Sequence, residues 1–572
     1  MYDKKLKKWT ASSAPSNIFY RPGNEMTAQE ALRSRFEEAD RALAAAENGS
    51  KNIDAVYMME SAAKAGSADA CLAMGQLFEY GWAVAKNKKQ AYIWYERAAR
   101  AGSAEAAEIL SLRKKQRANK IALIAIAAFL AAAIAAFCVV FLPGMLSRSN
   151  SGNNAPSLNV VLPGGVEYRE IGDINEHSAA IRDLMNRYDT DEIKSGKVHA
   201  NRILLVYKGD KLDLSGYGVV GAVGDKDYII LQFENAEDAE RCMNYLNTLE
   251  GTVAAQYGRY NTDAISSPSV SAGAGKSNAP EYHSPINGLD YWSWGAGMMN
   301  FDKYSVYLQK ILPEDHKITV AVIDTGTQPW PETEARILDG FDFNGLDPAG
   351  HHDYNGHGTH VAGTILDCTQ GVNVNILPCA VTDPTSEDCR GMTTEAIIEA
   401  LRFSIDKKAE VINMSLSGPY LGTQEDDLEE YWVNKAIDEG IVVCVAAGNQ
   451  AINAGGRSPA RVERCITVAG IDKYQASYVD TNYGSVVDVC APAVEILSNY
   501  HLADDVCYKT GTSMACPHIS AMAAMMQLEF HESPDVISFY MRSYTQQIGS
   551  DPDYFGAGMP DGSLILEYLL TG

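Results

Sequence analysis

Apolar residues along this chain gather in runs of two different lengths. One run, 121–142, holds 22 residues without a charge, about the number that a helix needs to cross a bilayer. From Ile318 onward the apolar runs are shorter and alternate with segments of helical spacing. That alternation predicts a parallel sheet with helices on both faces. We therefore expect one transmembrane helix followed, later in the chain, by an α/β domain.

The charges around the apolar run predict its orientation. Only Arg148 follows the run closely, whereas five basic residues crowd its N-terminal flank: Arg113, Lys114, Lys115, Arg117 and Lys120. The positive-inside rule then predicts a single-pass protein of the plasma membrane, with 1–120 in the cytoplasm and the part after 142 outside the cell. The reversed topology, with the distal part in the cytoplasm, is the alternative.

Residues 1–120 contain an internal repeat. The segment 62–70 returns as 98–106, an offset of 36 residues, with Ala and Gly at matching places. A period of that size is typical of stacked helical hairpins, and 52–113 resembles the Sel-one-like repeats. We expect an α-helical repeat region that either binds a cytoplasmic protein partner or serves as a stabilising cap.

The region between the apolar run and the α/β domain is predicted to be a small α+β unit. A polar linker, 143–159, precedes it, and the unit itself spans 160–258. Its strand and helix patterns are found at 203–207, 228–233, 236–249 and 253–257. The connection 259–284 is rich in Ser, Ala, Gly and Pro, as in segments that proteases cut. A spacer or ligand-binding domain is the competing interpretation of 160–258.

Four polar residues of the α/β domain, 285–572, stand where strands end or helices begin. Asp324 ends the apolar run 318–323, and His357 stands between two glycines at a predicted helix start. Asn449 ends another apolar run, and Ser513 lies in a small-residue turn before a helical pattern. Each residue alone is more simply explained as a turn, core or cap residue. Together they form a candidate site, because the carboxyl ends of parallel strands share one edge of the sheet.

The segments around these residues resemble the signature blocks of the subtilisin-like serine proteases. The likeness extends over about 290–535 and rests on 322–326, 355–363, 446–449, 511–518 and the supporting blocks 413–416 and 482–492. The order Asp, His, Ser is the one found in that family. The resemblance implies the subtilisin-like α/β fold. It also suggests that 160–258, which resembles the subtilase propeptide, is a pro-segment.

The resemblance implies peptide hydrolysis through an acyl-enzyme. Ser513 would be the nucleophile, His357 the base that Asp324 orients, and Asn449 an oxyanion donor. Substrate would lie along Ser415, Leu416, Ser417 and Gly418, and its primary side chain would meet Ala446, Ala447 and Gly448. We therefore expect a membrane-anchored, autoprocessed serine endopeptidase acting on proteins or peptides. The alternative is a catalytically silent sensor or scaffold that binds peptides.

The charge of the chain limits the classes of partner that it can bind. The net charge is −25, with +6 on residues 1–120 and −31 on the rest, which argues against nucleic acid as a partner. The chemistry requires no cofactor, although the resemblance makes structural calcium possible, with acidic residues such as Glu425 to Asp427 available.

Cys379 with Cys389, or Cys368 with either, could form a disulfide. Cys444, Cys465 and Cys490 lie in apolar runs and are predicted to be buried thiols.

Overall fold

A computed structural model describes the ranges 67–80, 94–95, 97–103, 106, 158–188, 198–261, 280–313, 315–343, 352–383, 391–420, 428–501 and 506–571. The chain divides into two compact units, Met1–Asn154 with Gly572 and Ala155–Thr571. The predicted membrane span 121–142 and most of the connection 259–284 lie outside these ranges. Within the ranges, no helix combines the length and the apolar character that crossing a bilayer requires.

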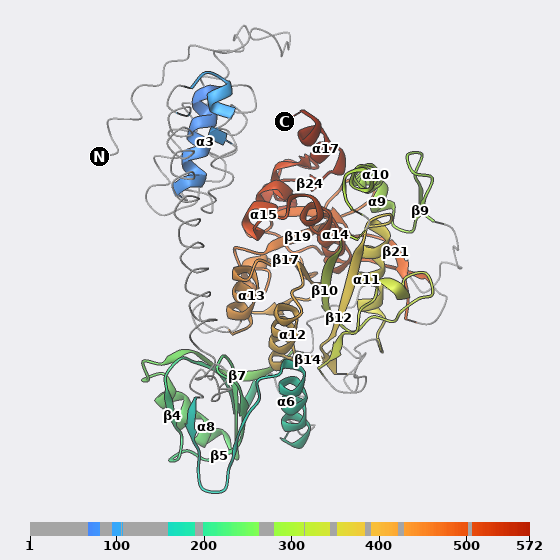
Figure 1. The fold of residues 1–572 in the computed structure, drawn as a ribbon. Helices are drawn as coiled ribbons and strands as arrows, with labels where there is room; N and C mark the ends of the chain where they lie inside the picture. Colours follow the sequence, from blue (N-terminus) through green and yellow to red (C-terminus); the bar gives the residue numbers. More distant parts are fainter. Residues whose placement is uncertain are drawn as a thin grey trace, which may run out of the picture. The chain divides into compact units, whose positions relative to one another are not determined.

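The first unit contains α3 (Ala68–Tyr80), which is drawn in blue in Figure 1. The two copies of the sequence repeat contain the same capping contact. Ser67 Oγ accepts a hydrogen bond from the amide of Ala70, and Ser103 Oγ accepts one from the amide of Ala106, both at 3.2 Å. A side chain on Gly75 would collide with the buried ring of Tyr95, so the helices approach closely there. The rest of the predicted repeat region lies outside the described ranges and stays a prediction.

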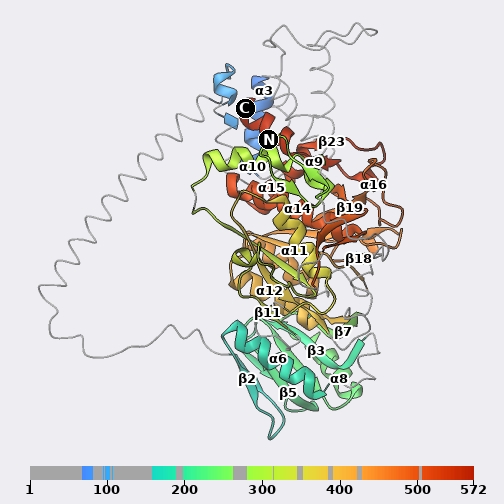
Figure 2. The ribbon, with the colours of Figure 1, turned by 90° about the vertical axis from the view of Figure 1, so that its right-hand side faces the viewer.

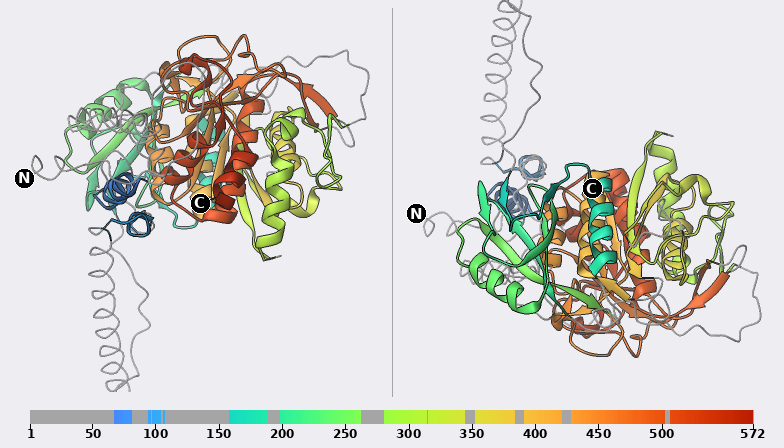
Figure 3. Two further views of the ribbon diagram at one scale, coloured as in Figure 1. Left: turned by 90° about the horizontal axis from the view of Figure 1, so that it is seen from above. Right: turned by 90° about the horizontal axis from the view of Figure 1, so that it is seen from below.

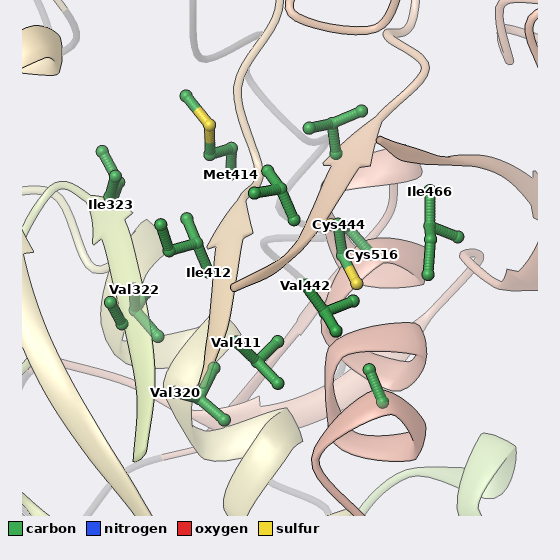
Figure 4. Packing of buried hydrophobic residues seen from close by; sticks show 14 of the residues in the cluster. Val320, Val322, Ile323, Val411, Ile412, Met414, Val442, Cys444, Ile466 and Cys516 are labelled. Carbon is green, nitrogen blue, oxygen red and sulfur yellow. The ribbon is translucent and has the colours of Figure 1, made fainter. Parts of the chain in front are cut away.

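The second unit contains a seven-stranded sheet in which all strands are parallel. The order is β11-β12-β10-β15-β17-β19-β20. These strands are β11 (Phe341–Asp342), β12 (Val374–Ala380), β10 (Ile318–Asp324), β15 (Val411–Met414), β17 (Val442–Ala446), β19 (Ile466–Ile471) and β20 (Val489–Pro492). Continuous apolar sequence suits them, because β15 and β17 are buried at every position. Figure 4 shows side chains of β10, β15 and β17 packed together in this core.

Two pairs of helices cover this sheet. In one pair, α11 (His357–Cys368) packs on α14 (Thr512–Phe530), and in the other, α12 (Thr394–Asp406) packs on α13 (Leu428–Asp438). Since the central strands are buried on both faces, the pairs cover opposite faces. The predicted α/β fold with a parallel sheet is therefore confirmed. The remaining helices of this domain are α9 (Trp294–Met298), α10 (Phe301–Ile311), α15 (Pro534–Ser543), α16 (Pro552–Phe555) and α17 (Gly562–Thr571).

A second seven-stranded sheet joins the predicted α+β unit to the α/β domain. Its order is β13-β14-β7-β3-β6-β5-β2, and only the β2–β5 pair is parallel. The strands are β13 (Thr382–Asp383), β14 (Gly391–Thr393), β7 (Thr252–Asn261), β3 (Val198–Tyr207), β6 (Ile229–Phe233), β5 (Val219–Gly224) and β2 (Tyr168–Glu170). Figures 1 and 2 show the α+β segment gathered at one end of the unit, next to α12.

The α+β segment has more elements than the sequence pattern predicted. The expected strands correspond to β3, β6 and β7, and the expected helix is α8 (Ala236–Leu246). The elements that were not predicted include β5, which lies in a Gly-rich stretch between β3 and β6, and α6 (Ile174–Tyr188), which precedes β3. Figure 3 shows α6 alongside the α/β domain, where it packs on α12. Short strands complete the unit: β1 (Asn159–Val161), β4 (Lys211–Asp213), β8 (Tyr282–His283), β9 (Asp290–Tyr291), β16 (Gly418–Pro419), β18 (Arg457–Ser458), β21 (Ile496–Asn499), β22 (Val506–Lys509), β23 (Thr545–Gln546) and β24 (Met559–Pro560).

Candidate active site

A buried carboxylate–imidazole pair lies at the carboxyl end of the parallel sheet. Asp324 is the last residue of β10, and its Oδ1 lies 2.7 Å from Nδ1 of His357, with both side chains fully buried. The amide of Thr325 donates to the same oxygen at 2.8 Å. If Nδ1 carries the proton that Asp324 accepts, the lone pair of Nε2 remains available as a base. Among the described residues, Nε2 has no hydrogen-bond partner.

Glycine on both sides of His357 has a steric reason. Gly356 adopts a left-handed φ of 86° directly before α11, a conformation that glycine adopts without strain. A Cβ on Gly358 would lie 2.1 Å from the carbonyl oxygen of Gly326, so only glycine lets the helix start this close to β10. Asp353 fixes the same turn by accepting from the amides of Gly356 and Thr359. The local sequence thereby holds the imidazole against the strand end.

Ser513 is the second residue of α14 and stands on the small-residue turn that begins the helix. Its hydroxyl donates to the carbonyl oxygen of Ser415 at 3.1 Å, and Ser415 Oγ donates to the carbonyl oxygen of Ser513 at 3.0 Å. The nucleophile predicted from sequence is therefore tied to the predicted substrate edge. Hydrogen bonds between catalytic groups are commonly long or poorly aligned before substrate binds.

The side-chain amide of Asn449 has a fixed orientation. Its Oδ1 accepts from the amide of Thr512 at 2.7 Å and from Thr512 Oγ1 at 3.0 Å. Thr512 Oγ1 accepts in turn from the amide of Gly448 at 3.0 Å. Because the oxygen is held by Thr512, the amide's N–H groups point the other way. Sequence reasoning missed the role of Thr512, although its place directly before Ser513 was a usable signal.

The two predicted substrate walls both approach this site. Gly418 belongs to β16, which pairs with β18, while Ala446 ends β17 beside β15. Gly448 has a left-handed φ of 103°. Asn482, from a supporting block of the sequence, braces this wall by donating to the carbonyl oxygen of Ala447 at 2.8 Å. The residues predicted at the site therefore belong to strand ends, helix starts and the turns between them.

Comparison with known proteins decides the family. The family model described as the Subtilase family matches residues 315–547 of this chain. Subtilisin DY of Bacillus licheniformis is 32% identical over 255 residues, which cover 42% of this chain and 88% of that protein. This chain belongs to the subtilase family. The matched range contains Asp324, His357, Asn449 and Ser513, so the resemblance seen in the sequence is confirmed.

Other relatives agree with this result. A thermophilic serine proteinase of Bacillus sp. (strain AK1) is 35% identical over 218 residues, or 36% of this chain and 51% of that protein. A solved cold adapted subtilisin-like serine proteinase is 29% identical with a TM-score of 0.37, covering 43% of this chain and 88% of that one. The chain spans about half the length of curated relatives such as the AK1 proteinase. The family match and the likeness to the AK1 proteinase and to subtilisin DY support the prediction of a serine endopeptidase.

Two further histidines near the subtilase site have structural partners. His360, one helical turn after His357, lies 2.9 Å through Nε2 from the carbonyl oxygen of Ile496, and burial lowers its pKa well below the usual range. His360 therefore ties α11 to β21 and has a structural role. His518 Nε2 accepts from Ser293 Oγ at 2.8 Å, and burial lowers its pKa to about 4. The Ser293 contact was missed because the two residues are 225 positions apart.

The cysteines correct one prediction. Cys368 and Cys379 are buried thiols rather than partners in a disulfide, so that pairing was wrong. Cys389 lies outside the described ranges, and its pairing stays untested. The predicted burial of the thiols at Cys444, Cys465 and Cys490 is confirmed, a physical consequence of their place in strands covered on both faces.

Metal binding stays a prediction. In the part of the chain that the structure describes, no group of three or more His, Cys, Asp or Glu side chains is arranged to hold a metal ion. The acidic residues Glu425 to Asp427 lie outside that part. The candidate catalytic groups themselves are a carboxylate, an imidazole, an amide and a hydroxyl, which are the kinds of group that acyl transfer by proton movement and hydrogen bonding requires.

Proposed function

We propose that this subtilase is a serine endopeptidase in which Asp324, His357 and Ser513 form the catalytic triad. The observation that carries the proposal is the fully buried Asp324–His357 pair at 2.7 Å, with Nε2 left without a partner among the described residues. His357 takes the proton of Ser513 as the hydroxyl attacks the peptide carbonyl, and later gives it to the leaving amine. Asp324 holds the tautomer and stabilises the imidazolium.

The tetrahedral oxyanion would be held by Asn449 and the amide of Ser513. Thr512 supports this role, because it binds the amide oxygen of Asn449 and so aims the N–H groups away from itself. Donors fixed in this way need no reorganisation when charge develops on the substrate oxygen. Ser513 Oγ must leave the carbonyl oxygen of Ser415 to reach His357, a side-chain rotation of the kind that substrate binding accompanies.

We further infer that the α+β segment is a pro-segment. Its last strand, β7, adds to β14 with Tyr260 opposite Thr393 and Asn261 opposite Met392. β14 lies beside β13, just after β12, at the sheet edge where the catalytic residues gather. An extended segment that continues from Asn261 along this edge approaches the site in the manner of a substrate strand.

Polar contacts also support the pro-segment assignment. Glu399 of α12 accepts from Ser178 Oγ at 2.7 Å and lies 3.1 Å from Nδ1 of His177. Arg202 Nη1 lies 3.1 Å from Glu395 Oε1. Gln256 Oε1 accepts from the amide of Leu428 at 2.7 Å, which caps α13. Apolar contacts share this interface, because Ile181, Tyr228 and Ala254 belong to the same buried cluster as the core of the α/β domain.

The sequence supports a membrane anchor at 121–142, and we propose a single-pass protein with the protease domain outside the cytoplasm. The topology is tested by protease protection in sealed membranes with an epitope before 121. Protection of that epitope together with digestion of the protease domain supports the proposal, and the reverse pattern contradicts it. Thiol labelling of Cys71 is a poor probe, because that residue is only 3% exposed.

Labelling with a fluorophosphonate tests the enzymatic proposal. We expect the wild-type protein to be labelled on Ser513, and the Ser513→Ala and His357→Ala variants to stay unlabelled. The competing function is a silent peptide-binding scaffold. It is favoured by the hydrogen bond from Ser513 to the Ser415 carbonyl oxygen, because a hydroxyl that donates there is not activated by His357. Absence of wild-type labelling after the pro-segment has been removed would establish that competitor.

A further inference from the structure

Arg457 is a buried cation that the proposed chemistry does not use. It lies in β18 and is 8% exposed. β18 pairs antiparallel with β16, which begins at Gly418, the last residue of the predicted substrate edge. Two of its hydrogen bonds go to one residue of that edge. Nε donates to Ser417 Oγ at 3.1 Å, and Nη2 donates to the carbonyl oxygen of Ser417 at 2.8 Å.

The second substrate wall reaches the same point. A Cβ placed on Gly448 would lie 3.0 Å from Ser417 Oγ, so the wall 446–448 closes toward Ser417. The guanidinium of Arg457 therefore lies where the two walls meet. By the proposed function, the side chain before the scissile bond enters between these walls.

A guanidinium at that position distinguishes side chains by charge. Arginine stays protonated even when buried, and it binds carboxylates through short, charge-assisted hydrogen bonds. A lysine or arginine side chain would bring a second cation into a site of low dielectric. A glutamine side chain fills the same volume as glutamate without the charge. The position therefore favours a carboxylate.

We propose that Arg457 makes this subtilase cut after acidic residues, with the substrate's Asp or Glu side chain directed at the guanidinium. The inference rests on the proposed function and names its substrate class. The chain itself contains a fitting site. β7 ends against β14 at Asn261, and Asp263, two residues later, is the only acidic residue in 262–279. Two residues of extended chain span about 7 Å. Self-processing is thus expected between Asp263 and Ala264.

The test uses the full-length chain and two readouts. The first is the N-terminus of the mature fragment, expected at Ala264. The second is kcat/KM for peptides that are identical except for Glu, Gln, Leu or Lys before the scissile bond. We expect Glu to exceed Gln by roughly 10- to 100-fold, the range for a hydrogen bond to a charged group. Arg457→Gln should remove most of that ratio, and Arg457→Lys should keep part of it.

Arg461→Gln provides the matched control. Arg461 follows on the same segment but pairs with Glu430 at 2.9 Å instead of contacting Ser417. Its loss should leave the Glu-to-Gln ratio unchanged. Thermal unfolding of each variant separates a folding defect from a change in selectivity, because the ratio is measured within one preparation.

The outcomes separate this inference from the function on which it rests. Ser513-dependent cleavage with Leu or Gln preferred over Glu, or an unchanged ratio in Arg457→Gln, would overturn the inference and leave the proposed function standing. Processing at a bond other than 263–264 in the wild type, blocked in Ser513→Ala, would do the same. A wild-type protein without any Ser513-dependent product would overturn both.

Discussion

The two seven-stranded sheets of this subtilase differ in how their halves are held together. Every strand of the parallel sheet comes from the α/β domain, and β15 and β17 are buried at every position. The mixed sheet takes five strands from 168–261 and two from 382–393. Its junction consists of the short β7–β14 ladder, of polar contacts, and of apolar side chains that continue into the core of the α/β domain. One sheet is thus formed within a single domain, and the other joins two segments that we propose to separate on processing.

The residues of the proposed chemistry and the segment that we propose to regulate it also belong to different sheets. The carboxyl edge of the parallel sheet carries the Asp324–His357 pair, whereas the mixed sheet holds the last residues of β7 against β14. Catalysis should therefore fail when the first region is altered, and attachment of the pro-segment should fail when the second is altered. Five predictions, from the largest effect to the smallest, follow from this account.

Removing the base has the largest expected effect. His357→Ala should lower kcat by about a million-fold, because without the imidazole neither the attack nor the leaving step has a proton carrier. Initial rates on a peptide substrate measure this loss. Thermal unfolding should show a folded protein, since the parallel core is untouched. A kcat within a hundredfold of wild type would contradict the assignment of His357.

Breaking the junction should weaken pro-segment attachment without touching the triad. Glu399→Ala removes one of the two carboxylates paired with Arg402, the other being Asp225. It also removes the buried acceptor that Ser178 and His177 share across the junction. The expected cost is about 3–5 kcal/mol, measured by urea unfolding in the Ser513→Ala background. Asp227→Ala is the control, because its pair with Lys208 is exposed and should be worth at most about 1 kcal/mol. Equal losses in both variants would refute a special role for the buried pair.

The same carboxylate gives this effect a pH dependence. Burial alone would raise the pKa of Glu399, but Arg402 and His177 lower it to about 2. A carboxylate with a depressed pKa stabilises the folded state above its unfolded pKa, near 4, and this contribution disappears as pH falls toward 2. The difference between wild type and Glu399→Ala should therefore shrink over that window.

Asn449 should matter for rate far more than for binding. Asn449→Ala is expected to lower kcat by about 100- to 1000-fold with KM little changed, because the donor acts on the oxyanion of the transition state. Thr512→Val, which removes the Oγ1 hydrogen bond to the amide oxygen, should give a smaller loss of the same kind. A change confined to KM would place Asn449 in ground-state binding instead.

His518 gives the smallest of the predicted effects. Its buried imidazole has a pKa of about 4, below the unfolded value near 6.5, so the unfolded chain binds the proton more strongly. Its contribution to the free energy of unfolding should fall by about 3 kcal/mol as pH drops from 6.5 to 4. The free energy of unfolding of His518→Gln should therefore fall less steeply with decreasing pH than that of the wild type. Asp367 contributes in the opposite direction to the pH dependence of the free energy of unfolding, because burial raises its pKa to about 7. Wild type and His518→Gln both contain Asp367, so the difference between them over the same pH range reports His518.

The sequence predicted the parallel sheet well, because its buried strands are continuous apolar runs that end in chemically distinctive residues. Asp324, His357, Asn449 and Ser513 were found at strand or helix ends for that reason. The mixed sheet was predicted only in part. β14 is three residues long and shows no periodicity, and its pairing with β7 depends on contacts about 130 positions apart.

Residues that act through a neighbour were also missed. Thr512 orients Asn449 by hydrogen bonds that only the folded turn creates. Arg457 lies in a two-residue strand after a Gly-rich turn, and a lone arginine there is unremarkable in sequence. Its importance comes from two hydrogen bonds to Ser417, which no spacing rule predicts.

The N-terminus of the mature fragment tests the central claim most directly. Full-length wild type and Ser513→Ala are expressed side by side, and their intact masses and N-terminal sequences are determined. The account predicts that the wild type alone is cut between 262 and 279, after β7 leaves the mixed sheet, while Ser513→Ala stays whole. Cleavage in both proteins would assign the cut to another protease, and a whole wild-type protein would contradict the separable pro-segment.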